Sequence, residues 1–293
     1  MERRWAGDLQ EASMDSVSDT APTLGSGIAG ASLDPEDWSG LRVLGHRMVD
    51  DMVDHLAGVA AGPVWTRMPD ALRGELRGAL PRAGEGLDAA YAAFRRLVQP
   101  YATGNLHPMF MGWVHGGGNP AGMLAELLAG ALNANLGGRD HAPIEVERQV
   151  IRWSAELVGL PAGASGLLVT GTSIANFIAV LVARTRALGA EVRRNGLGGV
   201  RLAAYASATA HSCIPRALDM AGIGSDQLRL VPCDGAQRMR LDVLADLIAA
   251  DRRTGLLPFL VVGTAGTVNT GAVDDLDGIA RLCAAEGVRF HVD

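Results

Sequence analysis

Hydrophobic positions in the first third of the chain recur at the spacing of helices. An amphipathic helix carries apolar residues three or four positions apart on one face. That spacing holds at Leu41, Leu44, Met48, Met52 and Leu56. We predict that this helix begins at Asp34, with Pro35 at its first helical position, and that further helices continue to about Val98. The first hundred residues carry no strand pattern, so this part is predicted to be helical.

Two long helices and then short apolar runs follow. The helices are predicted at Pro120–Asn133 and Ile144–Leu160. Five later runs have the length and composition of buried strands: Gly166–Val169, Arg201–Ala206, Leu228–Val231, Phe259–Val262 and Val288–Val292. Helical patterns separate them at Ser173–Leu188, Ile214–Met220, Leu241–Ala250 and Leu276–Ala285. Strands that alternate with helices predict an α/β fold, with a mostly parallel sheet flanked by helices.

Composition divides the chain into three parts. Residues 1–32 are rich in Ser, Asp, Thr, Ala and Gly, and we expect them to form a mobile arm. Residues 33–104 are predicted to be an N-terminal helical segment. Residues 105–293 carry the α/β pattern and begin with a glycine-rich loop of unusual aromatic content, NLHPMFMGWVHGGG.

Charge and cysteine content exclude several classes of protein. The net charge is −6 and 48% of the residues are hydrophobic, which favours a globular protein without a nucleic-acid or acidic-membrane surface. The three cysteines have no zinc-binding spacing, so we expect no metal site and a reduced, cytoplasmic setting. Neither a signal peptide nor an apolar stretch of the roughly 20 residues that cross a membrane is evident. All 26 basic residues are arginine, and the chain contains no lysine.

Candidate functional residues follow the predicted strands, because ligands of parallel sheets bind beyond the carboxyl ends of the strands. Gly171 permits a tight turn before a helix. The hydroxyls of Thr172 and Ser173, together with the free N–H groups of the helix start, suit a phosphate. An ordinary Ser/Thr helix cap is the simpler interpretation of the same residues.

Three further strand ends carry polar groups. His211 can stack on a flat ring or serve as a half-buried structural histidine. The loop at 263–274 is rich in small residues, and Asp274 at its end is a candidate cap for the next helix. Asp293 ends a buried strand, where a carboxylate needs a partner such as a protonated ring nitrogen or an arginine.

Taken in order, these motifs resemble the group II pyridoxal 5'-phosphate (PLP) dependent amino-acid decarboxylases, the family that includes aromatic-L-amino-acid decarboxylase. The resemblance covers about residues 34–293 and is most specific in NLHPMFMGW, LLVTGTSIANFIAVLVART, TAHSCIPRAL, GTAGTVNTGAVDDL and VRFHVD. It implies that residues 105–293 form an incomplete PLP-binding large domain of the type I PLP-dependent transferase fold. It also implies a homodimer, in which the N-terminal helical segment wraps across the partner.

The resemblance assigns the cofactor contacts. It implies that Thr172 and Ser173, with Gly171 beside them, hold the phosphate of PLP. It implies that His211 stacks on the pyridine ring and that Asp293 binds the pyridine nitrogen, so these two residues are the candidate catalytic groups.

The resemblance also indicates a loop and a substrate pocket. Thr267 matches a position in a loop beside the cofactor, while Phe110 and Trp113 match a segment that lines the substrate pocket. The two aromatic rings favour an aromatic amino acid as the small-molecule substrate. Simple packing of the rings is the alternative, and a polar pocket formed by Arg139, His141 and Glu145 is another.

The sequence departs from the family in three places. Family members often have Glu where this chain has Ile174, and Thr where it has Val268. Their cofactor lysine lies in a His-Lys pair some tens of residues beyond the HVD motif, whereas this sequence ends at Asp293. We therefore expect a fragment or a truncated product of a PLP-dependent carboxy-lyase.

Two other functions stay open from the sequence. One is a catalytically incompetent homologue that binds PLP weakly or only dimerises. The other is a different PLP reaction on the same fold, such as transamination or aldehyde formation, because a fold does not determine a reaction.

Overall fold

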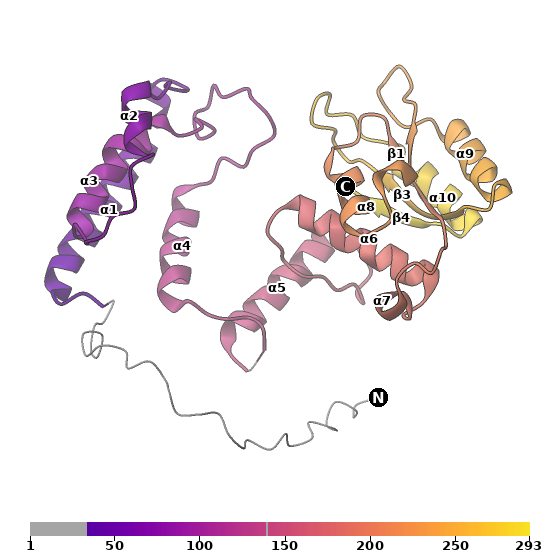
Figure 1. Cartoon of the computed structure of the whole chain (residues 1–293), viewed down its shortest axis with the longest axis horizontal. Helices are drawn as coiled ribbons and strands as arrows, with labels where there is room; N and C mark the ends of the chain where they lie inside the picture. Colours follow the sequence, from indigo (N-terminus) through magenta and orange to yellow (C-terminus); the bar gives the residue numbers. More distant parts are fainter. Residues whose placement is uncertain (1–33, 139) are drawn as a thin grey trace. The chain divides into compact units, whose positions relative to one another are not determined.

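The structure, a computed structural model, describes residues 34–138 and 140–293 (Figure 1). The arm predicted at 1–32 lies outside the described residues. The chain divides into two compact units, the first ending at Ala102 and the second beginning at Thr103. Each unit is described by itself.

The first unit is helical in its described residues, as the sequence predicts. Its elements are α1 (Trp38–Gly58), the 3-10 turn η1 (Val59–Ala61), α2 (Asp70–Glu75), α3 (Leu87–Leu97) and the 3-10 turn η2 (Gln99–Tyr101). Helix α1 packs beside α3 through a hydrogen bond of 2.7 Å from the Tyr91 hydroxyl to Asp51. Arg95 forms an ion pair with the same carboxylate.

The prediction that the first helix begins at Asp34, with Pro35 at its first position, is wrong by several residues. Helix α1 begins at Trp38, because the Asp37 carboxylate accepts hydrogen bonds of 2.9 Å from the N–H groups of Ser39 and Gly40. A capping carboxylate satisfies N–H groups that have no partner inside the helix, and this favours a start after Asp37.

The second unit contains a sheet of four parallel strands with helices around it. Its helices are α4 (Pro120–Leu132), α5 (Ala142–Leu157), α6 (Thr172–Leu188), α7 (Val192–Asn195), α8 (Cys213–Met220), the 3-10 turn η3 (Ser225–Gln227), α9 (Leu241–Arg253) and α10 (Leu276–Glu286). The strands are β1 (Leu202–Ser207), β2 (Leu228–Val231), β3 (Leu257–Gly263) and β4 (Arg289–Val292), in the order β2-β1-β3-β4. The predicted α/β fold with a parallel sheet is confirmed.

The strand predicted at Gly166–Val169 is wrong. The segment has no regular structure, and its Leu167 and Leu168 are 58% and 60% exposed. A strand needs a hydrogen-bonded neighbour. Among the described residues the sheet ends at β2 and β4, and neither of these strands pairs with this segment. An apolar run by itself therefore did not define a strand here.

Side chains that alternate along the strands build a core on each face of the sheet. Ala204 and Ala206 of β1 face α6 and α8, where they contact a cluster that includes Val180, Ile214 and Leu218. Ala203 and Tyr205 face the opposite way. Their cluster includes Leu244 and Ile248 of α9 and Ile279 and Cys283 of α10. The sheet is thus the middle of three layers, with α6 and α8 on one side and α9 and α10 on the other (Figure 1).

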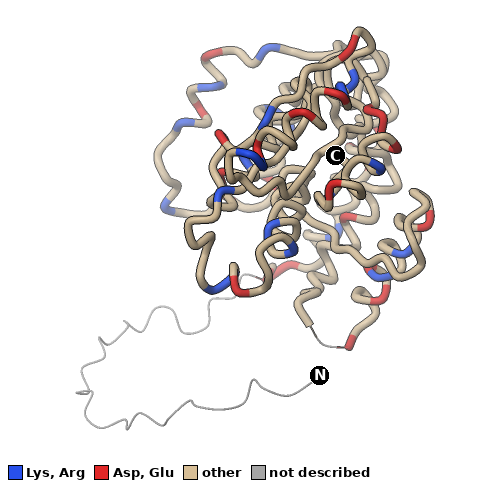
Figure 2. The backbone as a smooth tube through the Cα atoms, turned by 90° about the vertical axis from the view of Figure 1, so that its right-hand side faces the viewer, with Lys and Arg blue, Asp and Glu red and all other residues tan. Residues whose placement is uncertain are grey.

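Acidic and basic residues are mixed along both units (Figure 2). Several of them form ion pairs with near neighbours, among them Arg96 with Glu75 at 2.6 Å and Arg238 with Asp234 at 2.9 Å. Exposed pairs of this kind contribute little to stability.

The strand order marks the end of the sheet where a ligand would bind. The chain leaves β1 through α8 toward β2 at one edge, and leaves β3 through α10 toward β4 at the other edge. The connections that follow β1 and β3 therefore diverge. In parallel sheets ligands bind in the crevice that such a divergence creates at the carboxyl ends of the strands.

Candidate functional site

The start of helix α6 offers unsatisfied hydrogen-bond donors. Gly171 precedes the helix with a φ of 79°, a conformation that favours glycine, and it has no side chain that could cap the helix. In the described part of the chain, neither the backbone N–H groups nor the hydroxyls of Thr172 and Ser173 have a hydrogen-bond partner. Both residues lie inside the first turn, so they do not form the Ser/Thr cap that was the simpler interpretation. Free N–H groups and the helix dipole suit an anion at this position.

One turn further along α6, the buried side chain of Asn176 connects the start of α8 to the end of β4. Asn176 is 2% exposed. Its Nδ2 donates to Oδ1 of Asp293 at 2.8 Å and to Sγ of Cys213 at 3.3 Å. Its Oδ1 lies 2.6 Å from Nε2 of His291. Sequence reasoning missed this residue, although it is the one polar residue between Ile174 and Ala183.

Asp293 is held both through its backbone and through its side chain. Its N–H donates to the Gly263 carbonyl at 2.9 Å, and its carbonyl accepts from the N–H of Ala265 at 2.8 Å. These bonds attach it to the end of β3. Oδ1 accepts from Asn176, while Oδ2 has no partner among the residues that the structure describes. The half-buried carboxylate therefore keeps one oxygen available for a cationic N–H group.

His291 lies two residues before Asp293 on β4 and is held in its neutral form. Burial lowers the pKa of His291, the Arg289 guanidinium lowers it further, and the Asp293 carboxylate opposes both. Since the Asn176 amide directs its nitrogen at Asp293, its oxygen faces His291, and the imidazole donates from Nε2.

His211 stands at the end of β1, next to this group. The residue is exposed, and its Nδ1 accepts a hydrogen bond of 3.2 Å from the N–H of Cys213 at the start of α8. The Cys213 thiol is buried beside Asn176, and burial together with the Asp293 carboxylate raises the pKa of Cys213. Hydrogen bonds thus join His211 to Asp293 through Cys213 and Asn176.

The loop after β3 differs from the expected helix cap. Asp275, not Asp274, caps α10 by accepting from the Gly278 N–H at 2.9 Å. Asp274 is buried and accepts from the N–H groups of Thr264 at 2.8 Å and Met239 at 2.6 Å. It is held inside the unit because these two backbone groups need an acceptor there.

Thr267 is used within its own loop. Its hydroxyl lies 2.6 Å from that of Thr270 and accepts from the Ala272 N–H at 3.2 Å. The buried Thr264 hydroxyl, by contrast, has no partner among the described residues. The Thr267 hydroxyl therefore stabilises the loop that follows β3, next to the divergence point between β1 and β3.

Phe110 and Trp113 form a separate aromatic cluster. The two ring centroids are 6.3 Å apart, and His115 stacks at 6.0 Å from Phe110 and 5.5 Å from Trp113. Trp113 is 74% exposed and has a φ of 53°. The ring contacts described for these residues join them to one another, and not to the residues at the strand ends.

The residues of the alternative polar pocket, predicted at positions 139, 141 and 145, form only local contacts where the structure describes them. Arg139 lies outside the described residues. His141 bonds to the Asn135 carbonyl at 2.9 Å, and Glu145 pairs with Arg148 at 2.5 Å, one helical turn away.

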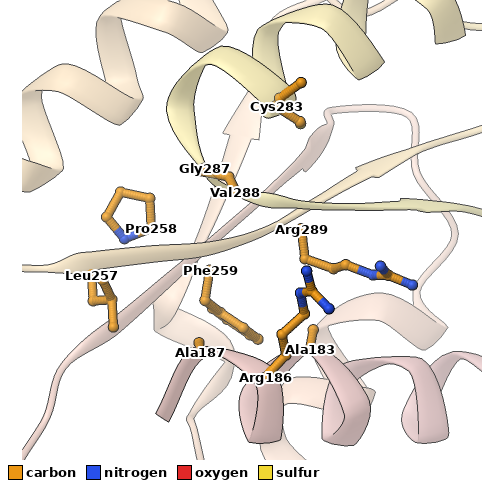
Figure 3. Close-up of a pocket in the computed structure, with 11 residues that line it drawn as sticks. Ala183, Arg186, Ala187, Leu257, Pro258, Phe259, Cys283, Gly287, Val288 and Arg289 are labelled. Carbon is orange, nitrogen blue, oxygen red and sulfur yellow. The ribbon is translucent and has the colours of Figure 1, made fainter. Parts of the chain in front are cut away.

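A cavity of about 460 Å³ lies at the opposite end of the sheet (Figure 3). Its lining includes Leu257 at the start of β3 and Arg289 at the start of β4, and the Arg186 and Arg289 side chains lie side by side in it. Since the strands are parallel, this cavity is at their amino ends and is separate from the groups around Asp293.

Comparison with known proteins gives the class of protein. Residues 69–293 match the family model described as the pyridoxal-dependent decarboxylase conserved domain. The chain belongs to this family, and the cofactor of the family is PLP. No helix in the described ranges 34–138 and 140–293 is long and apolar enough to cross a membrane.

Individual members of the family show which proteins the chain is similar to. The chain is 33% identical over 258 residues to aromatic-L-amino-acid decarboxylase of Bacillus atrophaeus, covering 86% of this chain and 52% of that protein. It is 30% identical over 273 residues to tryptophan decarboxylase 2 of Oryza sativa, covering 89% of this chain and 54% of that protein. The solved structure of Oryza sativa TDC with PLP and tryptamine superposes with a TM-score of 0.80 at 26% identity, covering 89% of this chain and 56% of that one. The chain thus spans about half the length of these relatives.

The groups at the strand ends fit PLP. The start of α6 presents unpaired donors suited to a phosphate, and Asp293 presents a free carboxylate oxygen suited to a protonated ring nitrogen. His211 is exposed and is joined to Asp293 by hydrogen bonds through Cys213 and Asn176, and it offers a flat ring. The donors, the acceptor and the ring match the three parts of that cofactor.

Proposed function

We propose that this chain supplies the phosphate and ring sites of a PLP-dependent amino-acid decarboxylase. The observation that carries the proposal is the convergence of the α6 start, His211 and Asp293 on one end of the sheet, linked through Asn176. A homologue that only dimerises would make no use of this convergence, whereas one that binds PLP weakly would.

Each residue has a separate task in this proposal. Thr172 and Ser173 bind the phosphate through their N–H and hydroxyl groups, and this anchors the cofactor at the helix start. Asp293 accepts the proton of the pyridine nitrogen and keeps it on the ring. His211 covers one face of the ring and limits its rotation. When bound, the cofactor supplies an electron sink for the charge that remains after CO₂ leaves an amino acid.

We propose aromatic amino acids as the substrate class. The cluster of Phe110, Trp113 and His115 offers rings on which an aromatic side chain can stack. The relatives from Bacillus atrophaeus and Oryza sativa, described as aromatic-L-amino-acid and tryptophan decarboxylases, support the same class.

A homodimer and a cytoplasmic location, both predicted from the sequence, are part of the proposal. Helix α4 supports association, because it exposes a row of large apolar side chains, Leu124, Leu127, Leu128 and Leu132. A contiguous apolar surface of this kind marks an interface in soluble proteins.

Binding of pyridoxamine 5'-phosphate to the purified chain tests the cofactor site. This form of the cofactor carries its own amine, so its binding does not depend on a lysine. We expect measurable binding by calorimetry, and an affinity at least about tenfold weaker in Asp293→Asn, because one charge-assisted bond is worth about 1.5–3 kcal/mol.

The control is Asp277→Asn, the same change at an exposed residue of α10, which should bind like the wild type. Absence of binding to the wild-type chain would favour the incompetent homologue. Amine, aldehyde and CO₂ formed from tryptophan, tyrosine and glutamate in the presence of PLP then separate decarboxylation from aldehyde formation. The second reaction needs this check because phenylacetaldehyde synthase of Arabidopsis thaliana is 29% identical to the chain.

A further inference from the structure

We infer that Asn176 is a positioning residue that fixes the direction of the Asp293 carboxylate, so that its free oxygen faces the ring nitrogen of the cofactor. The inference rests on the proposed function and adds a residue to it. Its basis is a single buried amide that bonds to side chains of two other segments, Cys213 at the start of α8 and His291 and Asp293 at the end of the sheet.

The amide of Asn176 has only one consistent orientation. Its two N–H groups are directed at Asp293 Oδ1 and Cys213 Sγ, and its carbonyl oxygen receives the Nε2 proton of His291. Rotation of the amide by half a turn would place its oxygen against the Asp293 carboxylate and its N–H groups against a donor. Since all three partners of the observed orientation are satisfied, the amide is locked.

The fixed Asn176 amide also fixes the orientation of the Asp293 carboxylate, because the backbone of Asp293 is itself held in place. Its backbone is bonded on both sides to the end of β3, at Gly263 and Ala265. With the backbone held and Oδ1 bonded to Asn176, the direction of Oδ2 is determined. An acceptor whose direction is set before its partner arrives binds more tightly, because no ordering cost is left.

Asn176 also relates the two ends of the cofactor site. It lies four residues after Thr172, so both side chains project from the same face of α6. Four residues of helix rise about 6 Å along the axis. One rigid turn therefore sets the spacing between the phosphate-binding start of α6 and the carboxylate that Asn176 holds.

A purely structural role is the alternative for Asn176. A buried amide with three partners stabilises a fold wherever it occurs, and its removal leaves buried polar groups unpaired. Such a role would lower the stability of the chain without changing the protonation of a bound ring. The test must therefore measure that protonation as well as affinity.

The first measurement needs no variant. In the full chain labelled with ¹⁵N-histidine, the His291 signal is assigned by its loss in His291→Gln, and we expect its proton on Nε2. A proton on Nδ1 would overturn the inference, because the Asn176 amide would then point the other way.

The second measurement uses pyridoxamine 5'-phosphate labelled with ¹⁵N at the ring. Asn176→Leu keeps the size of the side chain without its amide, and Asn176→Asp places a second carboxylate against Asp293. We expect affinity to fall about tenfold in the first variant and further in the second. The ring nitrogen should change from the protonated toward the unprotonated chemical shift in Asn176→Leu.

The matched control is Tyr205→Phe. Tyr205 donates to the buried carboxylate of Asp251 at 2.8 Å on the other face of the sheet, so this variant also removes a donor from a buried carboxylate. It should keep both the affinity and the ring signal of the wild type.

The outcomes separate the inference from the proposed function. Wild-type binding with unchanged affinity and ring protonation in Asn176→Leu would overturn the inference alone. An equal loss in Tyr205→Phe would also overturn it, because the effect would then follow stability. A wild-type chain that does not bind pyridoxamine 5'-phosphate would overturn both.

Discussion

At the scale of single residues, the environment of His291 combines opposing effects. Burial and the nearby Arg289 guanidinium favour the neutral imidazole, while the Asp293 carboxylate favours the charged one. The pKa of His291 is lowered overall from its ordinary value of 6.5, so burial is the larger effect. The Asn176 oxygen fits this balance, because it accepts the single proton that a neutral ring keeps on Nε2.

The lowered pKa of His291 predicts how stability depends on pH. Below about pH 6.5 the unfolded chain binds a proton at this residue and the folded chain does not. The free energy of unfolding should therefore fall as the pH drops from 6.5 toward the lower, folded-state pKa, and the contribution of this residue should be constant above 6.5. Urea denaturation between pH 8 and pH 5 measures this, with His291→Gln for comparison. Equal pH slopes for the two proteins would contradict the prediction.

The candidate residues differ in how far sequence could identify them. Thr172, His211 and Asp293 each come within a few residues of an apolar run, so the local pattern identified them as candidates, although the run before Thr172 forms no strand. Asn176 is different, because its partners His291 and Asp293 lie 115 and 117 residues away in the sequence. Contacts of that separation depend on the strand order, which the local pattern does not contain.

At the scale of elements, strands were predictable where helices cover both faces. All four strands of the sheet lie within two residues of their predicted bounds, because each is a short, largely apolar run between helices. The central strands β1 and β3 are buried, whereas the edge strands β2 and β4 are only partly so. The segment at 166–169 has the same composition but no neighbour to pair with, and it forms no strand. The caps at Asp37 and Asp275 also differed from expectation, since several nearby polar residues could have accepted the same bonds.

The carboxylate of Asp274 is the main polar link between two loops. It binds the N–H of Met239, after β2, and the N–H of Thr264, after β3. Asp274→Ala leaves both donors buried without an acceptor. We therefore expect the free energy of unfolding to fall by about 2–4 kcal/mol. Chemical denaturation measures the change. Asp277→Ala, at an exposed site of α10, should change stability by no more than about 0.5 kcal/mol. Similar effects for the two variants would show that the link is weak.

At the scale of the whole molecule, most of the buried core belongs to the three-layer α/β part. The two clusters on either face of the sheet hold nearly all of the fully buried side chains, such as Leu218, Leu244 and Leu260. Helix α4, in contrast, has no buried residue. Its sequence predicted the helix correctly, yet neither its pattern nor its length indicated which surface would cover it.

The exposed leucines of α4 make self-association testable. Leu127 and Leu128 are 56% and 65% exposed, so Leu127→Glu with Leu128→Glu should leave folding intact while it disrupts a dimer. Light scattering across a concentration series measures the expected shift from dimer to monomer. Met220→Glu, a change at a 58% exposed residue of α8, serves as the control. A wild-type chain that is monomeric at every concentration would contradict the proposed dimer.

The common direction of the four strands has a practical consequence for labelling. The residues proposed to bind the cofactor lie where the strands end, whereas Leu257 lies where β3 starts, six residues before its last residue and roughly 20 Å away. Since these 293 residues contain no lysine, Leu257→Lys would introduce the only side-chain amine among them, at the amino end of β3. A fluorophore coupled to this amine would report on cofactor binding at the carboxyl ends of the strands. It would not contact the residues that are proposed to bind the cofactor.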